Sequence, residues 1–255
     1  MLLLGLFLGL HRYGERCEGG TPRGLTLSRY WQWLHRRHEV EANVWKGVVL
    51  PEPRVSDVEK ERPFTEAELQ TLLSGPATER MHDLMRMGAL TGSRIDPIVC
   101  LRVKDCENDT FRFKPQKREP GPRLCPIHPD LQRIVARRCE GKHPDDDLFP
   151  EWPYLNSKDG QREKSSKASE EFTRYRRRVG VDDVIPGNRR ARVNFHSFRR
   201  WFATEAERAD QPPHIISAVI GHRDGRAGTT LSVYSSGPKL EQARRCVEAV
   251  RLPSS

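Results

Sequence analysis

The sequence predicts a mainly α-helical α+β fold that contains a small antiparallel β-sheet. Apolar residues recur at the three- and four-residue spacing of helices through most of the 255-residue chain. One stretch, residues 110–128, instead alternates and turns at a Pro-Gly-Pro tip, which is typical of a β-hairpin. Residues 51–62 are charged and proline-rich, so we expect them to link a short region, residues 1–50, to a larger domain, residues 63–255.

The first helix that we expect lies in the segment LSRYWQWLHRRHEVEANVW, residues 27–45. Its apolar positions at helical spacing are Leu27, Tyr30, Trp31 and Leu34. After the linker, Thr65 and Glu68 have the spacing of a capping box, in which each side chain accepts a hydrogen bond from the other residue's backbone. The leucines that follow share one face of a helix and are Leu69, Leu72 and Leu73.

A second helix of the larger domain runs through RMHDLMRMGAL and ends at Thr91-Gly92, where the glycine suits a C-terminal cap. Ser93 is placed to cap the next helix, RIDPIVCLRV, whose Pro97 falls in the first turn and costs little there. More helical patterns follow the hairpin: PDLQRIVARRCE, ASEEFTRYRRRVG, HSFRRWFATEAERA, HIISAVI and PKLEQARRCVEAVRL. The last has an apolar stripe formed by Leu240, Ala243, Val247 and Val250.

Charge points to a polyanionic partner. Lys and Arg total 44 against 35 Asp and Glu, a net charge of +9, which indicates nucleic acid or an anionic membrane surface as the partner. The alternative is a soluble protein with a basic surface. Residues 161–200 hold twelve Lys or Arg and five Asp or Glu. Clustered arginine is typical of a phosphate-facing surface, so we expect a DNA-binding face that includes Arg174, Arg176, Arg177 and Arg178.

The N-terminal run MLLLGLFLGL resembles the core of a signal peptide, but no basic residue precedes it and no small-residue cleavage site follows. It is too short to span a bilayer, so we interpret it as a buried helix or as a start placed inside a longer gene. The six cysteines form no CxxC pair and have no histidines at zinc spacing. We therefore expect reduced thiols, a cytoplasmic location, no membrane segment, no metal and no cofactor.

Three segments carry candidate anion-binding groups. His196 and Arg199 are three residues apart and share a face at the start of a helix, where an anion is favoured. The alternative is that His196 caps the helix and Arg199 forms a surface ion pair. Arg94 lies at the first turn of another helix, and Lys117 lies in the hairpin arm, with Lys114 as its alternative if the register slips.

Near the C-terminus, Gly221-His222 precedes Tyr234, which is either a half-buried ring or an exposed nucleophile. Tyr175 is the alternative nucleophile because it lies in a richer basic run, although no histidine accompanies it.

Together, these motifs resemble the catalytic domain of the tyrosine recombinases, the phage-integrase family. That signature comprises a TGxR arginine, a hairpin lysine, an HxxR helix, a GH pair and a C-terminal tyrosine, matched here over residues 63–251 by Arg94, Lys117, His196, Arg199, His222 and Tyr234.

The resemblance implies an integrase-like fold and a site-specific DNA recombinase that integrates or excises a mobile element. Tyr234 would be the nucleophile and form a 3′-phosphotyrosyl intermediate, with His196 as general base, Lys117 as general acid, and Arg94, Arg199 and His222 on the phosphate. Double-stranded DNA is the implied partner. The other hypotheses are an inactive DNA-binding remnant and a nicking-closing topoisomerase with the same chemistry.

This sequence departs from the family's pattern at three places. The acidic residue that commonly follows the first arginine by three positions is Pro97 here, and the stretch from His222 to Tyr234 is longer than usual. The family usually has several helices before the linker, so residues 1–50 look like a truncated core-binding domain. In the family the C-terminal helix commonly docks on a neighbouring protomer. Because its stripe is modest here, we expect a monomer in solution that assembles into a homotetramer only on DNA.

Overall fold

A computed structural model describes residues 23–46, 60–115, 121–157, 160–162, 164–185, 191–222 and 238–253 of the chain. The chain divides into two compact units, Met1–Asp57 and Val58–Ser255. In the first unit, α2 (Arg23–His35) lies in the segment where a helix was expected. The residues that follow α2 turn back along it, since Asn43 donates to the backbone carbonyl of Ser28 at 2.8 Å and the rings of Trp31 and Trp45 meet edge to face.

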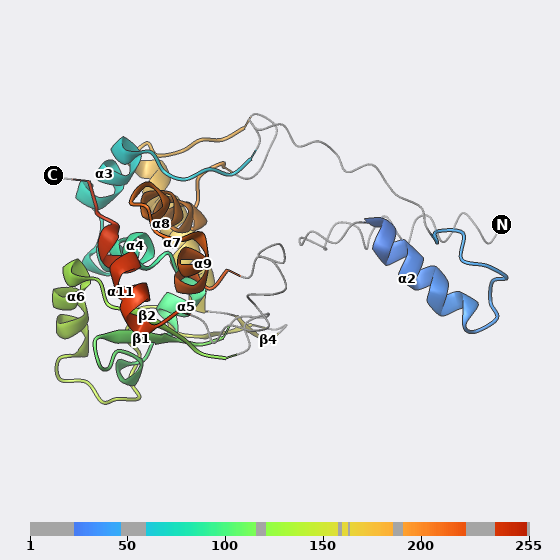
Figure 1. The fold of residues 1–255 in the computed structure, drawn as a ribbon, viewed down its shortest axis with the longest axis horizontal. Coiled ribbons are helices and arrows are strands. Elements are labelled where there is room, and N and C mark those ends of the chain that lie inside the picture. The colour runs from blue at the N-terminus through green and yellow to red at the C-terminus, as the bar shows by residue number, and fades with distance from the viewer. Residues whose placement is uncertain are drawn as a thin grey trace. The chain divides into compact units, whose positions relative to one another are not determined.

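The second unit is mainly α-helical, as predicted (Figure 1). Its two antiparallel hairpins pair β1 (Thr110–Phe113) with β2 (Arg123–Pro126) and β3 (Leu155–Ser157) with β4 (Gly160–Arg162). The first is the predicted hairpin. The second was not predicted, although its Asp159-Gly160 pair is a common turn signal. The helices are α3 (Glu66–Ser74), α4 (Glu79–Thr91), α5 (Ile95–Val99), the 3₁₀ helix η2 (Val103–Asp105), α6 (Pro129–Cys139), α7 (Lys164–Arg178), α8 (His196–Arg208), α9 (Pro213–Ile220) and α11 (Leu240–Ala249).

Local sequence signals set several helix ends. The capping box of α3 is formed as predicted, because Glu68 donates its backbone amide to the Thr65 hydroxyl at 3.2 Å and accepts from the Thr65 amide at 2.8 Å. Gly92 ends α4 in the left-handed conformation with φ of 60°, which a side chain would disfavour. The predicted cap of the next helix was wrong: α5 begins after Arg94, and the buried Ser93 hydroxyl instead accepts a hydrogen bond from Arg123.

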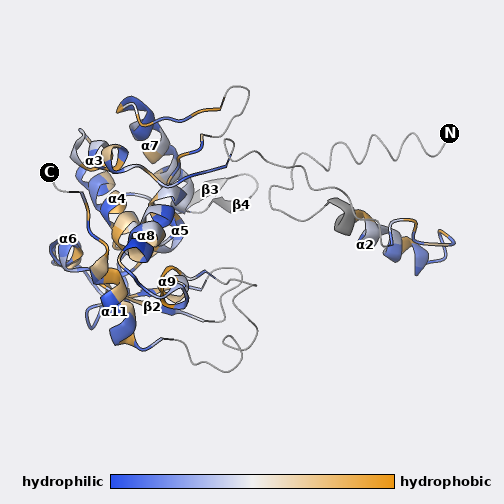
Figure 2. Ribbon diagram, turned by 45° about the horizontal axis from the view of Figure 1, so that its top comes forward, coloured by the Kyte–Doolittle hydropathy of each residue, from blue (hydrophilic) through white to orange (hydrophobic). Residues whose placement is uncertain are grey.

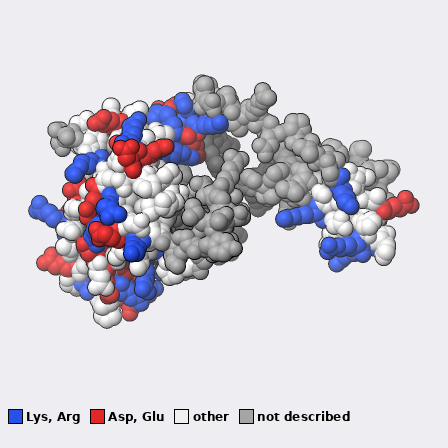
Figure 3. Space-filling model, viewed as in Figure 1, with Lys and Arg blue, Asp and Glu red and all other residues white. Residues whose placement is uncertain are grey.

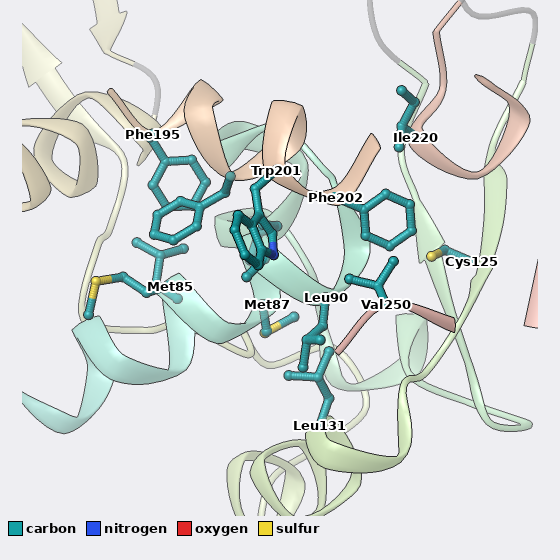
Figure 4. Close-up of a cluster of buried hydrophobic side chains, with 14 of the residues drawn as sticks. Met85, Met87, Leu90, Cys125, Leu131, Phe195, Trp201, Phe202, Ile220 and Val250 are labelled. Carbon is teal, nitrogen blue, oxygen red and sulfur yellow. The ribbon is translucent and has the colours of Figure 1, made fainter. Parts of the chain in front are cut away.

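Helix α4 lies at the centre of the unit and packs against α3, α5, α6 and α8. Figure 4 shows Met87 of α4 near Trp201 of α8, and Leu90 of α4 beside Leu131 of α6. The two helices approach closely at Gly88, where an added Cβ would lie 2.8 Å from the ring of Phe195. Hydrophobic and hydrophilic residues alternate along the helices (Figure 2), and the hydrophobic core is built largely from the helices' apolar residues.

The C-terminal helix α11 packs against α8, α9 and β2 of the same unit. Of its predicted apolar stripe, Ala243, Val247 and Val250 are buried within this chain, whereas Leu240 remains 42% exposed. Most of the stripe therefore belongs to the unit's own hydrophobic core, since the chain itself covers it.

The surface of the second unit carries charges of both signs. Figure 3 shows Lys and Arg side chains interspersed with Asp and Glu on the face in view. Basic residues of this unit are held in ion pairs, such as Arg80 with Glu171 and Arg244 with Asp109. In the described part of the chain, no helix has the length and apolar character needed to cross a membrane.

Candidate active site

Helix α8 begins with His196, and Asn194 prepares that start. The Asn194 side chain accepts a hydrogen bond from the His196 backbone amide at 2.9 Å, and the Asn194 carbonyl accepts from the Ser197 amide at 2.9 Å. These bonds occupy amides that lack partners within the first turn of a helix. Asn194, and not His196, is therefore the capping side chain, which leaves the imidazole available for another role.

Arg199 connects two segments that are far apart in the sequence. Its side chain is only 4% exposed, and Nη1 donates to the backbone carbonyl of Gly92 at 3.1 Å and to that of Ile220. Gly92 and Ile220 each lie two residues before another candidate residue, Arg94 and His222 respectively. The idea that Arg199 forms a surface ion pair was wrong, because its guanidinium is buried on these carbonyls and ties both segments to α8.

The positive charge of Arg94 acts on the imidazole of His196. Burial has the largest effect on the pKa of His196, and together with the positive charges of Arg200, Arg199 and Arg94 it lowers that pKa to about 4, against a smaller opposing effect of Glu61. Arg94 is half-buried at the start of α5 in extended backbone. Three guanidinium groups therefore act on one imidazole, which is the charge pattern of an anion-binding site.

His222 follows the C-terminus of α9 and its side chain is exposed. Gly221 adopts the left-handed conformation with φ of 68°, and the His222 amide donates to the Ser217 carbonyl at 2.8 Å. This bond turns the chain at the end of α9, as a Schellman-type C-terminus does. The structure thus brings together Arg94, His196, Arg199 and the segment that ends at His222.

Two predicted site residues, Lys117 and Tyr234, lie outside the described residues. The rival lysine, Lys114, is exposed one residue after β1. The rival tyrosine, Tyr175, is only 4% exposed, and its hydroxyl donates to the Leu72 carbonyl at 2.8 Å. Because this phenol is buried and hydrogen-bonded between α7 and α3, it has a structural role, and Tyr234 stays the predicted nucleophile.

The basic run on α7 is not one continuous surface. Arg174 and Arg177 are exposed, as the DNA-binding prediction requires. Arg178 is also exposed, but it donates to the Pro76 carbonyl at 2.9 Å and lies over the Tyr175 ring. For Arg176 the prediction was wrong: it is 2% exposed and donates to the Val181 carbonyl at 2.7 Å and to Asp182, so it holds the end of α7 in place.

Two further arginines at the site had no clear signal in the sequence. Arg200 follows the HxxR motif and pairs with Glu61 at 2.7 Å. Arg123, at the start of β2, donates to the Ser93 hydroxyl at 3.1 Å and to the Val219 carbonyl. The partners of both arginines are distant in the sequence, so local patterns do not reveal these contacts. The one available signal was the four-residue spacing of Arg200 from His196, which places both side chains on the same face of a helix. Among the residues with described positions, no group of three or more His, Cys, Asp or Glu is arranged to hold a metal ion.

Comparison with known proteins places these residues in a wider context. Residues 62–236 match the sequence model of the phage integrase family. The chain is also 27% identical, over 181 residues, to the "Putative integrase/recombinase y4gC" of Sinorhizobium fredii (strain NBRC 101917 / NGR234). That alignment covers 69% of this chain and 84% of the relative.

Solved structures share the fold at low sequence identity. An integrase from mycobacterium phage Brujita has a TM-score of 0.57 at 18% identity, over 92% of this chain and 75% of that one. A lambda integrase (75–356) dimer bound to a COC′ core site has a TM-score of 0.57 at 16% identity, over 80% and 72%. The Tn1549 transposon integrase (aa 82–397) in complex with circular intermediate DNA has a TM-score of 0.52 at 16% identity, over 87% and 76%.

Proposed function

This chain belongs to the phage integrase family, and we propose that it is a tyrosine recombinase that cuts and rejoins double-stranded DNA at specific sites. The observation that carries the proposal is the pair of hydrogen bonds from Arg199 to the carbonyls of Gly92 and Ile220. These bonds support the proposal because they join α8 to the turn before Arg94 and to the end of α9 before His222, the segments that carry the candidate residues. The relative from Sinorhizobium fredii supports the same activity, because the alignment with this chain covers 84% of that relative.

The site suits a phosphate because its charges are arginines. Attack on a phosphodiester passes through a transition state with more negative charge on the non-bridging oxygens than the ground state carries. Arg94 and Arg199 add fixed positive charge there, and the half-buried Arg94 can offer phosphate the paired N–H donors of a guanidinium. Nη1 of Arg199 is already bonded to two backbone carbonyls, so this arginine acts chiefly through its charge. One well-placed donor to the transition state is worth about 3 kcal/mol.

His196 suits the role of general base because it is neutral. With a pKa of about 4 its imidazole is neutral at neutral pH and has one unprotonated ring nitrogen. The negative charge of a bound phosphate would raise this pKa and so strengthen the base that accepts the proton of the phenol. The proposed nucleophile is Tyr234: its oxygen bonds to phosphorus, its proton passes to His196, and the bond to the 5′ oxygen breaks. Lys117 gives the proton that the leaving 5′ hydroxyl needs. The 3′-phosphotyrosyl ester keeps the bond energy, so rejoining requires no nucleotide cofactor.

A duplex that carries a nick near the cleavage site tests this proposal, because the short cleaved strand diffuses away and the covalent adduct accumulates. We expect an adduct with the parent chain, none with Tyr234→Phe, and retained DNA binding by that variant. Tyr154→Phe is the matched control because Tyr154 is an exposed tyrosine, at 48%, that is not among the proposed site residues, and it should leave the adduct unchanged. An adduct that persists in Tyr234→Phe would refute the nucleophile assignment.

The same assay separates the alternatives. A chain that binds DNA but never forms an adduct is an inactive remnant of an integrase. One that forms the adduct and relaxes supercoiled DNA, yet never exchanges strands between two duplexes, is a nicking-closing topoisomerase. Exchange between two duplexes is the result that our proposal requires.

Assembly and organisation are part of the same proposal. Residues 1–50 would contribute to the DNA clamp as part of a core-binding domain, residues 51–62 would be the linker, and residues 63–255 the catalytic domain. We further propose a cytoplasmic protein that is monomeric in solution and forms a homotetramer on DNA, since most of the α11 stripe is already buried in the chain's own core. Light scattering that finds a stable tetramer without DNA would contradict this.

A further inference from the structure

Helix α9 ends with four backbone carbonyls that have no partner inside the helix, as every helix does. The Ser217 carbonyl accepts from the His222 amide at 2.8 Å, and the Ala218 carbonyl accepts from the Gly221 amide at 3.2 Å. The remaining two carbonyls are bound by arginine side chains: Val219 by Arg123 and Ile220 by Arg199. Both arginines come from elements distant in the sequence, so they fix where α9 ends.

The same two arginines also bind neighbouring residues in the turn between α4 and α5. Arg199 donates to the Gly92 carbonyl, and Arg123 donates through Nη2 to the Ser93 hydroxyl at 3.1 Å. Ser93 is 1% exposed, and its own amide donates to the Thr91 hydroxyl at 3.1 Å. Each guanidinium therefore spans from this turn to the end of α9, and the two spans run side by side.

Arg123 differs from Arg199 in the element that carries it. It is the first residue of β2, opposite Phe113 in the β1–β2 register, and its guanidinium lies 4.8 Å from the centre of the Phe113 ring. The loop that joins these two strands contains Lys117 in its sequence. A cation held over an aromatic ring and bonded at two ends has few conformations left, so this side chain joins the hairpin rigidly to both other segments.

We propose that Arg123 is a positioning residue for DNA cleavage: it holds the turn before Arg94 against the end of α9 before His222, and fixes the paired strands β1 and β2 to both. This inference rests on the proposed recombinase function. Arg123 acts through other residues and needs no contact with DNA. Its removal should therefore slow cleavage while the affinity for DNA is kept.

Three variants test the inference. Arg123→Gln removes the charge and cannot span both acceptors, whereas Arg123→Lys keeps the charge and can still reach one of them. Arg112→Gln is the matched control, because Arg112 is an exposed arginine on the neighbouring strand of the same hairpin. At saturating nicked duplex, we expect adduct formation by Arg123→Gln to be about ten- to a hundredfold slower, as for a misplacement of about 1 Å. Arg123→Lys should recover part of the rate, and Arg112→Gln should match the parent.

Hydrogen exchange provides a second readout that needs no activity. Two hydrogen-bonded amides lie close in sequence to the acceptors of Arg123: that of Gly92, one residue before Ser93, and that of His222, three residues after Val219. In Arg123→Gln, both should exchange about tenfold faster, while amides of α6 keep the parent rate. Ser93→Ala removes only the acceptor in the turn, so it should speed exchange at Gly92 and leave His222 unchanged.

The outcomes separate the two proposals. A parent chain that forms no adduct refutes the recombinase function, and the exchange rates then decide on Arg123 alone. A parent rate of cleavage in Arg123→Gln, or an equal loss of rate in Arg112→Gln, would overturn the inference.

Two other results for Arg123→Gln would assign the residue a different role. A weaker affinity for DNA at an unchanged cleavage rate would make Arg123 a phosphate-binding residue, and faster hydrogen exchange throughout the unit would make it a general stabilising residue. Either result also overturns the inference.

Discussion

Glu61 accepts a hydrogen bond from the guanidinium of Arg200 at 2.7 Å, although 139 positions separate them in the sequence. Arg200 lies four residues after His196 on α8, so the two side chains share a face. The charges of Glu61 and Arg200 therefore act on the same imidazole, with opposite sign. Contacts of the neighbouring backbone support the pair, since Arg62 donates its amide to the Arg192 carbonyl at 2.9 Å.

The opposite signs lead to a prediction for the pKa of His196. Arg200→Gln removes a positive charge, so the pKa should rise from about 4 toward its ordinary value of 6.5. Glu61→Gln removes a negative charge, so the pKa should fall. Both can be measured by NMR titration of the imidazole Cε1–H resonance. His82, whose pKa is lowered mainly by burial, is the internal control. A shift in the same direction in both variants would contradict the electrostatic account.

The stability of the unit should depend on pH through the same group. The pKa of His196 is lower when folded than when unfolded, so between pH 6.5 and about 4 the unfolded chain binds more protons. The contribution of His196 to the free energy of unfolding is therefore complete above pH 6.5, and it is lost as the pH falls toward 4. Urea unfolding from pH 7 to pH 4 measures this slope. His196→Gln should flatten it, and an unchanged slope would show that other groups set the pH dependence.

The basic run of α7 should separate into two classes of residue. Replacing the exposed Arg174 and Arg177 with Gln should weaken binding to all DNA sequences alike and reduce the salt slope by about one for each bond to phosphate that the substitutions remove. The buried Arg176 should behave differently. Arg176→Gln should lower the free energy of unfolding by about 1–3 kcal/mol and leave the salt slope unchanged, because its bonds end on Val181 and Asp182. A reduced slope in Arg176→Gln would return this residue to the DNA-binding surface.

A buried ion pair joins α4 to α6 and should be important for stability. Asp83, 3% exposed, accepts from Arg138 at 2.6 Å and from Arg137 at 2.8 Å. Asp83→Asn removes the shorter of the two carboxylate contacts of the buried Arg138 and leaves the one to Glu151 at 3.2 Å, so we expect a loss of about 3 kcal/mol in the free energy of unfolding. The control is Glu205→Gln, which breaks a surface pair with Arg208 and should cost less than about 1 kcal/mol. Equal effects of the two substitutions would contradict this prediction.

Short-range signals in the sequence were sufficient for several elements. The capping box of Thr65 and Glu68 and the left-handed cap at Gly92 depend on residues within a few positions, so each could be predicted before the structure. The order of the site motifs likewise identified the family, and the structure brings Arg94, His196 and Arg199 together.

Long-range contacts could not be predicted in the same way. Whether an arginine faces DNA or a backbone carbonyl depends on which segments fold beside it, as for Arg176 on α7 and for Arg123, whose acceptor Val219 is 96 positions away. The same holds for Tyr175, whose buried hydroxyl bonds Leu72 across 103 positions. Periodicity placed these residues on helices or strands correctly but does not say what covers each face.

The burial of Arg199 affects which residues an integrase gene keeps after its product has lost the ability to cleave DNA. Because this side chain closes the carbonyl ends of two helices, selection for folding alone retains it, together with the glycine that ends α4. A descendant that has lost DNA cleavage but still binds DNA would therefore keep this arginine. An intact HxxR motif alone would then not separate active members of the family from inactive ones, and a screen for functional mobile elements should require the nucleophile as well.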